Sequence, residues 1–155
     1  MDILEDNAKT PVETIAQMIG EPAEKVRQAI ERLEKDKIIL GHKAIIDNER
    51  ANRNIVRTII EVKVKPERNG GFDRIAERIA KFEGVQSCYL MSGAYDLLVM
   101  LEGSDLKSAA RFVSEKLAMI DGVLSTATHF MLKSYKERGT LFDSTSESDQ
   151  LKVSP

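Results

Sequence analysis

The chain contains very little of what would assign it to a specialised class of protein. Its 155 residues include one cysteine, four prolines and no tryptophan. The single cysteine, Cys88, excludes an intrachain disulfide, and a reducing, cytoplasmic location is therefore expected. No apolar run approaches the roughly 18 residues of a membrane helix, and nothing at the N-terminus resembles a signal peptide. A globular protein without a membrane partner is expected, since 42% hydrophobic and 31% charged residues are ordinary values for that class.

Patterns for catalysis and for metal binding are also missing. His42 and His129 are far apart in the sequence and have no cysteine or clustered carboxylates beside them, so no metal site is expected. Gly70-Gly71 alone is not a phosphate-binding fingerprint, and no Ser-His-Asp order is accompanied by supporting motifs. Cys88 lies in a predicted strand without a catalytic neighbour, which indicates a packed thiol. We therefore expect neither an enzyme nor a cofactor.

An excess of positive charge is missing as well. The formal net charge is −2, and residues 1–50 carry 8 Lys and Arg against 11 Asp and Glu. Residues 51–155 carry 15 Lys and Arg against 14 Asp and Glu, so the deficit of positive charge lies in the N-terminal third. Because phosphate contacts supply most of the non-specific affinity for DNA, this distribution argues against nucleic-acid binding by that part of the chain.

What the sequence does contain is a short repeat in its C-terminal two thirds. Residues 83–87 and 121–125 both read acid-Gly-Val-x-Ser. Each copy follows an amphipathic helical pattern and opens an apolar strand pattern, and each helix is itself preceded by a strand pattern. Two βαβ halves in tandem are therefore predicted, which is the ferredoxin-like βαββαβ arrangement, over residues 55–138.

The N-terminal third shows a different pattern, that of a helix-turn-helix. One helical pattern ends at Gly20 and the next begins at Pro22, which leaves too short a connection for an antiparallel pair. Residues 38–46 read as a small hairpin after the second helix, in the position of a wing. The predicted class is therefore α+β, with a winged helix-turn-helix over residues 1–47 whose first helix is shortened. The polar residues 48–54 are the predicted linker.

The end of the chain has a composition of its own. Residues 139–155 are rich in Ser, Asp, Glu and Thr and show no hydrophobic period. Such segments bury too little apolar surface to fold by themselves. We therefore predict a mobile tail over these residues.

Five motifs occur in an order and spacing that are specific in combination. Two of them, residues 15–20 and 26–39, lie in the helix-turn-helix, and a third, residues 39–47, is the hairpin. The fourth, residues 92–98, contains the turn Ser92-Gly93-Ala94-Tyr95-Asp96, and the fifth, residues 122–136, contains the last strand. In these motifs the chain resembles the Lrp/AsnC ("feast/famine") family of bacterial and archaeal transcription regulators. The resemblance implies a sequence-specific DNA-binding regulator that responds to a small amino-acid effector. It also implies a homodimer that assembles further into a tetramer or octamer.

The chain departs from the family pattern in its N-terminal part. The first helix of the family is longer than the one in this chain. The turn before the family's recognition helix usually offers Ser or Thr. Here that turn reads Glu21-Pro22-Ala23-Glu24, and its two carboxylates should repel phosphate. A second hypothesis therefore stays open: an amino-acid-sensing oligomer with a degenerate head that does not itself bind DNA.

The polar side of the second helix supplies the candidates for contact with double-stranded DNA. Arginine and glutamine are residue types that make bidentate contacts with base edges, and lysines meet phosphates. The alternative interpretation is a solvated helix face on which glutamates pair with these residues at i,i+3 or i,i+4 spacing. The candidates are Lys25, Arg27, Gln28, Arg32 and Lys35.

The resemblance also implies an effector site. In the family, the Gly-x-Tyr-Asp turn lies between dimers and frames a pocket for a small amino acid. Backbone N–H groups of such a turn bind a carboxylate, an aspartate receives the ammonium, and threonines of the last strand add hydroxyl contacts. The alternatives are a tight turn that needs its Gly and Asp, and threonines chosen for strand propensity. The candidates are Gly93, Ala94, Tyr95, Asp96, Thr126 and Thr128.

The predicted sheet has more apolar positions than one layer of helices can cover. Two helices on one face of a four-stranded sheet leave the other face bare, and a bare apolar face is a partner site. We therefore predict an isologous dimer that packs sheet to sheet. The apolar strand positions counted for this prediction are Ile59, Val99, Met100, Leu101, Phe130 and Leu132.

Overall fold

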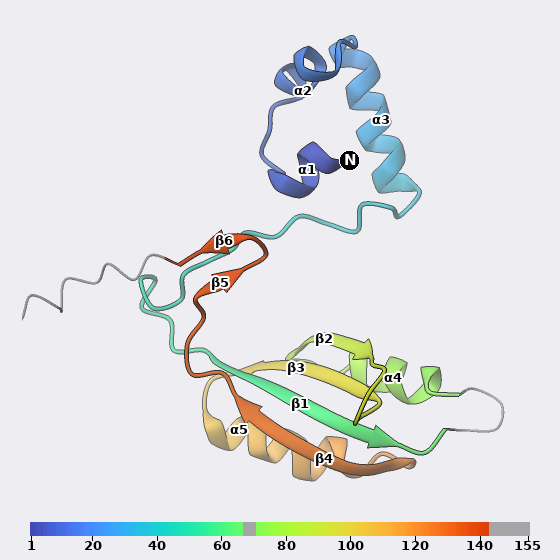
Figure 1. Cartoon of the computed structure of the whole chain (residues 1–155), viewed down its shortest axis with the longest axis vertical. Helices are drawn as coiled ribbons and strands as arrows, with labels where there is room; N and C mark the ends of the chain where they lie inside the picture. The colour runs from blue at the N-terminus through green and yellow to red at the C-terminus, as the bar shows by residue number, and fades with distance from the viewer. Residues whose placement is uncertain (67–70, 143–155) are drawn as a thin grey trace, which may run out of the picture. The chain divides into compact units, whose positions relative to one another are not determined.

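The computed structural model of the chain describes residues 1–66 and 71–142 (Figure 1). The chain divides into two compact units, Met1–Ala44 and a second unit that begins at Ile45. Each unit has its own apolar core. Within the described residues, none of the helices combines the length and the apolar character that a membrane crossing requires.

The first unit consists of three helices. They are α1 (Asp2–Asp6), α2 (Val12–Ile19) and α3 (Ala23–Lys35). The connection between α2 and α3 is only three residues long, as the positions of Gly20 and Pro22 predict. The apolar stripes of the helices face one another and bury Ile15, Ala16 and Val26, around which Ile3, Leu4, Val12, Ala23 and Ile30 pack.

The prediction of a hairpin after α3 is wrong, because residues 38–46 form no strand. The backbone N–H groups of Ile38 and Ile39 both donate to the carbonyl of Leu33, at 2.9 and 3.0 Å, and so complete the C-terminal end of α3. Those amides are unavailable for a strand ladder. Leu40, the next apolar residue, is 86% exposed. An isolated two-stranded hairpin is marginal without a surface to pack against, and an apolar residue as exposed as Leu40 provides no such packing.

The second unit is built on one antiparallel sheet. Along the chain its elements are β1 (Val56–Val64), α4 (Asp73–Ala80), β2 (Val85–Leu90), β3 (Leu97–Gly103), α5 (Leu106–Arg111), the π-helical turn η1 (Phe112–Leu117) and β4 (Val123–Phe130). The strands lie in the order β2-β3-β1-β4, and every neighbouring pair is antiparallel. The predicted α+β class is confirmed, and the order of elements is the predicted βαββαβ.

The repeated acid-Gly-Val-x-Ser motif takes equivalent places in the two halves. Gly84 and Gly122 each lie between a helix and the following strand, with φ of 88° and 93°. Only glycine adopts such values without strain. The carbonyl of Gly84 accepts from the N–H of Glu102 at 2.9 Å, and that of Gly122 accepts from the N–H of Lys65 at 2.7 Å. Each copy therefore fastens its helix-to-strand turn to a strand of the sheet.

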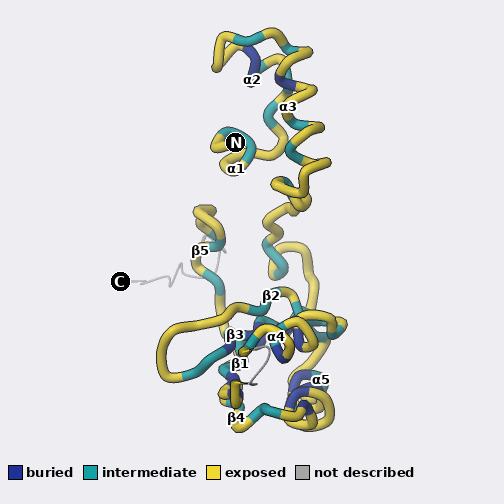
Figure 2. Tube along the Cα trace, turned by 90° about the vertical axis from the view of Figure 1, so that its right-hand side faces the viewer, coloured by how far each residue is buried: buried dark blue, intermediate teal, exposed yellow. Residues whose placement is uncertain are grey.

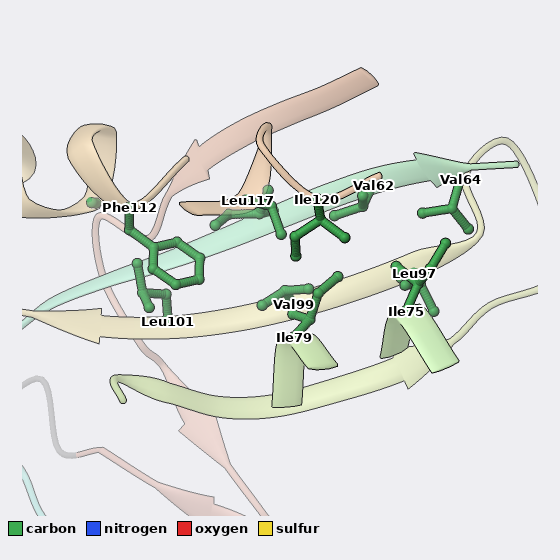
Figure 3. Packing of buried hydrophobic residues seen from close by; sticks show 12 residues of the cluster. Val62, Val64, Ile75, Ile79, Leu97, Val99, Leu101, Phe112, Leu117 and Ile120 are labelled. Carbon is green, nitrogen blue, oxygen red and sulfur yellow. The ribbon is translucent and has the colours of Figure 1, made fainter. Parts of the chain in front are cut away.

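The core lies between the sheet and its helices. Alternate residues of β1 and β3 are buried, so a single face of the sheet carries the apolar side chains. Figure 3 shows Ile75 and Ile79 of α4 together with Phe112 and Leu117 of η1 directed at that face. In the tube of Figure 2, the buried stretches of this unit lie on its strands and on the helices that cover them. The helices therefore cover one face and leave the other without a helix.

A small hairpin follows the sheet. Its strands are β5 (Lys136–Glu137) and β6 (Thr140–Leu141), with Lys136 opposite Leu141. The prediction of a mobile tail is wrong for residues 139–142, because these residues belong to or adjoin this hairpin. The remainder of the predicted tail, residues 143–155, lies outside the described residues.

Candidate functional site

The polar side of α3 carries the five residues predicted to contact DNA, and all five are exposed. Arg27 donates from one terminal nitrogen to Glu24 at 2.7 Å, and its other terminal nitrogen lies 3.7 Å from Glu13 on α2. The amide of Gln28 donates to the second oxygen of Glu24 at 2.9 Å. These donors from Gln28 and Arg27 hold the pKa of the Glu24 carboxyl below its ordinary value. One glutamate thus fixes both residues that are suited to reading bases.

Two of the three remaining cations of α3 also lie close to a carboxylate. Lys25 pairs with Glu21 at 2.9 Å, and Arg32 lies 3.5 Å from Asp36. Among the described residues, Lys35 makes no ion pair. Exposed pairs of this kind contribute little to stability and exchange readily with other charges. The face is therefore close to neutral as folded, yet every cation on it remains accessible.

The Gly93–Asp96 turn joins β2 to β3 and is attached to the end of β1. The N–H of Asp96 donates to the carbonyl of Val62 at 3.0 Å, and the carbonyl of Asp96 accepts from the N–H of Met91 at 2.8 Å. One carboxylate oxygen of Asp96 accepts from the N–H of Val64 at 2.9 Å. The pairing of β1 with β4 shifts register between Lys63 and Val64, so this side chain satisfies an amide beside the irregularity. Among the described residues, the other carboxylate oxygen accepts no hydrogen bond.

Thr126 and Thr128 are on the opposite side of β1 from that turn. They pair across the sheet with Val62 and Ile60, whose side chains are buried beneath the helices. Residues directly opposite one another share a face of the sheet, so both threonines point to the helix-covered face at its β4 edge. Within a single chain the fold does not bring them against the turn, because β1 lies between them.

The face without helices is only partly apolar. Pairing places Ile59 beside Met100 and Glu61 beside Leu98 on this face. Polar side chains flank the apolar residues: the Glu61 carboxylate lies 3.3 Å from the His129 imidazole on β4. Of the six residues counted from the sequence, two belong to the buried core instead, Val99 and Leu101. Phe130 pairs with Thr58 and so shares the helix-covered face, and Leu132 lies beyond the end of β4. The apolar part of this face is therefore narrower than predicted, and charge surrounds it.

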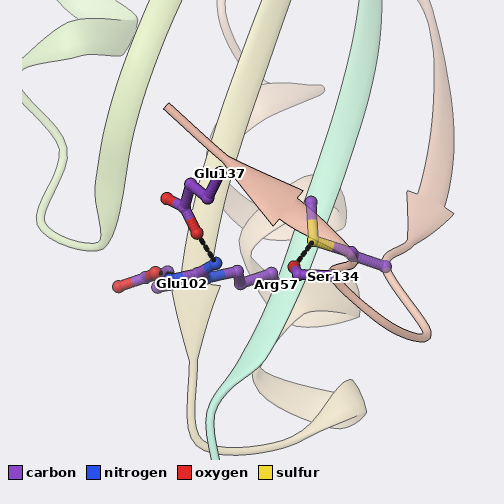
Figure 4. A network of polar contacts seen from close by, with 5 residues as sticks. Arg57, Glu102, Ser134 and Glu137 are labelled. Atoms are coloured by element: carbon purple, nitrogen blue, oxygen red, sulfur yellow. Dashed lines mark hydrogen bonds and ion pairs between the residues drawn. The ribbon is translucent and has the colours of Figure 1, made fainter. Parts of the chain in front are cut away.

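One polar cluster was not found from the sequence. At the start of β1 the guanidinium of Arg57 donates to Glu102 of β3 at 2.8 Å and to Glu137 of β5 at 2.6 Å (Figure 4). Burial opposes the charge of Arg57, but the hydrogen bonds to Glu137 and Glu102 outweigh it and raise the pKa of the guanidinium. Glu137 is 80 positions away in the chain, and no motif connects the two residues. In the described part of the chain, no group of three or more His, Cys, Asp or Glu is placed to hold a metal ion.

Comparison with known proteins assigns this architecture to a family. The model of the Lrp/AsnC ligand binding domain matches residues 57–141. The chain belongs to the Lrp/AsnC family. The matched part runs from the start of the sheet to the β5–β6 hairpin, and so includes both the Gly93–Asp96 turn and the Arg57 cluster.

Similar proteins extend the likeness over the whole chain. The HTH-type transcriptional regulator YugG of Bacillus subtilis is 45% identical over 156 residues, which cover 100% of this chain and 94% of that protein. The regulator LrpA of Pyrococcus abyssi is 31% identical over 136 residues, 88% and 94% of the two chains. A transcriptional regulator of Neisseria meningitidis in complex with L-Met has the same fold, with a TM-score of 0.68, 20% identity and coverage of 91% and 90%. This Lrp/AsnC chain therefore matches its relatives in both of its units.

Proposed function

We propose that this protein is a sequence-specific DNA-binding transcriptional regulator that responds to a small amino acid. The observation that carries the proposal is the α2–α3 pair, whose short connection and apolar contact leave the polar side of α3 free for the major groove. The relatives YugG and LrpA, named as HTH-type transcriptional regulators, support it. We assign residues 1–47 to the DNA-binding head in spite of the missing wing, 48–54 to the linker and 55–138 to the body.

DNA would meet the exposed face of α3. Arg27 and Gln28, held together by Glu24, are placed in the first half of the helix, where recognition helices approach base edges. Lys25, Arg32 and Lys35 are the candidates for phosphate contacts. Binding then requires the phosphates of DNA to replace Glu21 and Asp36 as partners of two of these cations.

The effector would bind at the turn between β2 and β3. Its carboxylate would lie on backbone N–H groups of Gly93, Ala94 and Tyr95, and its ammonium on the free oxygen of Asp96. Thr126 and Thr128 can reach such a ligand only from another subunit, since β1 separates them from the turn within one chain. The L-Met complex of the Neisseria regulator supports the class of ligand.

Assembly would join the heads in pairs. The sheet face around Ile59, Leu98 and Met100 is suited to pack on a second copy and form an isologous dimer. Two heads on one dimer bind two half-sites of a pseudo-palindrome with an added effective concentration. Dimers would associate further into a tetramer or octamer, and the effector would favour one assembly because it binds the two states with different affinity.

The test is binding of the pure protein to fluorescently labelled fragments of the DNA upstream of its own gene, followed by anisotropy over a range of salt concentrations. We expect the logarithm of the binding constant to fall with the logarithm of salt, with a slope near −0.9 for each phosphate contacted. Thermal shift with each of the twenty amino acids, together with light scattering, identifies the effector and the assembly. No binding at low salt would contradict the proposal.

One observation favours a second candidate function. Four of the five candidate residues on α3 already have a carboxylate partner within the first unit. The alternative is an amino-acid-sensing oligomer whose head does not bind DNA. The two functions differ in the salt titration, since this alternative predicts no measurable slope, while both predict a response in the amino-acid screen.

A further inference from the structure

A pocket in the second unit lies apart from the turn, and it shares only Arg57 with the rim of the sheet face described above. It has a volume of about 490 Å³ and is formed by the segment 46–57 and the segment 131–142. Pockets for small organic ligands typically measure about 300 to 1,000 Å³. Both walls belong to the second unit, and one of them is the linker that leads to the head. The pocket therefore has the size of a ligand site and a wall that is connected to the DNA-binding part.

Four cationic side chains line this pocket against two carboxylates, Asp47 and Glu49. Arg57 is already held by two carboxylates, and Arg50 lies 3.6 Å from Asp47. Arg53 and Lys133 also line the pocket, and neither pairs with a carboxylate among the described residues. Both side chains are exposed and can turn toward a ligand. Two cationic groups that no carboxylate neutralises, one on each of the two segments, favour an anion.

The rest of the lining is suited to an apolar body. Ile55 and Met131 are half-buried beside the cations, and Phe142 adds an aromatic ring. The Nζ atom of Lys133 lies 5.3 Å from the centre of the Tyr135 ring, which places this ammonium at the edge of the aromatic side chains. A molecule with a negative end and a short hydrocarbon body matches both parts of the lining.

We propose that this pocket binds a small organic carboxylate with an apolar body. The carboxylate would lie between Arg53 and Lys133, and the hydrocarbon part against Met131 and Phe142. The site is distinct from the proposed effector turn, which is fastened to Val62. Arg57, in the pocket lining, is five positions before Val62 on β1, so about 17 Å of strand separate the two places. A ligand here would fix residues 47–54, and so act on the linker directly.

The test uses the full-length protein labelled with ¹³C in the methyl groups of its six methionines. Met131 lines the pocket, whereas the backbone of Met91 is bonded to the Gly93–Asp96 turn, so the two resonances report the two places separately. Sodium 4-methyl-2-oxopentanoate is the probe, because it has a carboxylate and a branched apolar body without an ammonium group. We expect the Met131 methyl to shift and saturate while the Met91 methyl stays in place.

Charge removal tests the assignment of the residues. The double variant Arg53→Gln/Lys133→Gln changes exposed side chains only and should bind the probe at least about tenfold more weakly, since it loses two charge-assisted contacts. The matched control Arg78→Gln/Lys81→Gln removes two positive charges from exposed positions in and directly after α4 and should bind as the unmodified chain does. An unchanged affinity in the first variant would overturn the proposal.

The remaining outcomes are also decisive. A shift of Met91 alone would place the carboxylate at the turn, which supports the proposed effector site and refutes the pocket. A Met131 resonance that moves with protein concentration and not with the probe would show that a second copy of the chain fills the pocket, which likewise refutes it. The DNA-binding proposal stands or fails on its salt titration and is not affected by either result.

Discussion

At the scale of single residues, the core of the second unit contains a polar group without a partner. The hydroxyl of Thr58 on β1 is buried and makes no hydrogen bond to the described residues. Valine has nearly the same shape and lacks the hydroxyl. We expect Thr58→Val to raise the free energy of unfolding by about 1 kcal/mol, because an unsatisfied buried hydroxyl is removed. Urea unfolding followed by circular dichroism measures it, with Thr128→Val at an exposed position as the control.

A loss of stability in Thr58→Val would contradict this account. It would mean that the hydroxyl finds a partner in solution, such as a water molecule. The control should change the unfolding free energy by less than about 0.5 kcal/mol, as substitutions at exposed positions usually do. The difference between the two variants therefore isolates the effect of burial.

Cys88 gives a prediction about pH. Burial raises the pKa of its thiol, because the thiolate is poorly solvated beside Ala76 of α4. The folded pKa is thus above that of the unfolded chain, so this stabilising contribution is complete below the unfolded pKa of about 8.5 and is lost as pH rises through the folded value. We expect the unfolding free energy of the native chain to fall above that pH more steeply than that of Cys88→Ala. Equal slopes in urea titrations would contradict the prediction.

At the scale of elements, most of the body could be predicted from the sequence, because each of its helices and long strands has its own hydrophobic period and ends at a turn residue. Gly84 and Gly122 marked both halves correctly. The absence of the wing could not be predicted, because the apolar run at 38–40 has no period that distinguishes a strand from the end of α3. The β5–β6 hairpin was missed since its strands are two residues long.

The candidate site was predictable only in part, because local patterns determine some of its residues and tertiary contacts determine the others. Sequence spacing placed the five polar residues on one side of α3, because helical periodicity determines that. The bond from Val64 to Asp96 depends on a register shift between β1 and β4, and no local pattern records it. The pairing of β3 with β1 likewise determines that Val99 and Leu101 point to the helix-covered face of the sheet. Residues joined only by the tertiary fold, such as Arg57 and Glu137, leave no signal in a single sequence.

The β5–β6 hairpin depends on that last pair. Its two strands share few bonds, and the Glu137 carboxylate attaches it to Arg57 of the sheet at 2.6 Å. We expect Glu137→Gln to weaken the hairpin by about 0.5 to 1 kcal/mol, a modest value because Glu137 is partly exposed. Hydrogen exchange of the Phe142 amide, which donates to Tyr135 in the hairpin, should become faster. Glu61→Gln, which disturbs a pair on the sheet, is the control and should leave this amide unchanged.

The α3 face gives a second prediction for an element, and this one rests on the proposed DNA binding. Glu24 holds Arg27 and Gln28 and opposes phosphate by its charge. We expect Glu24→Gln to raise affinity for non-specific DNA several-fold at low salt and to reduce discrimination between target and random sequence. Glu31→Gln removes the same charge from α3 without touching Arg27, so it should raise affinity and retain discrimination. If neither variant changes DNA binding, the degenerate-head alternative is favoured.

At the scale of the whole molecule, the proposed dimer rests on the sheet face that no described helix of the second unit covers. Ile59 and Met100 lie side by side at its centre, between the Arg57–Glu102 ion pair and the contact of Glu61 with His129. Burying that face against a second copy would remove apolar surface from water and align the two charged rims about a two-fold axis. The narrow apolar centre makes the dimer sensitive to a single added charge, because a lysine there would be buried without a partner.

We therefore expect Met100→Lys to convert the assembly to monomers at micromolar concentration, as measured by size-exclusion chromatography with light scattering. DNA affinity should fall with it, by about 10² to 10⁴, because the second head no longer binds at an effective concentration. The control Leu106→Lys adds the same charge at an exposed position on the helix side and should retain at least the dimer. A Met100→Lys protein that is folded by circular dichroism and still dimeric would show that the sheet face is not the interface. The pairing of heads would then require another surface, and the salt slope of the variant would remain that of the native chain.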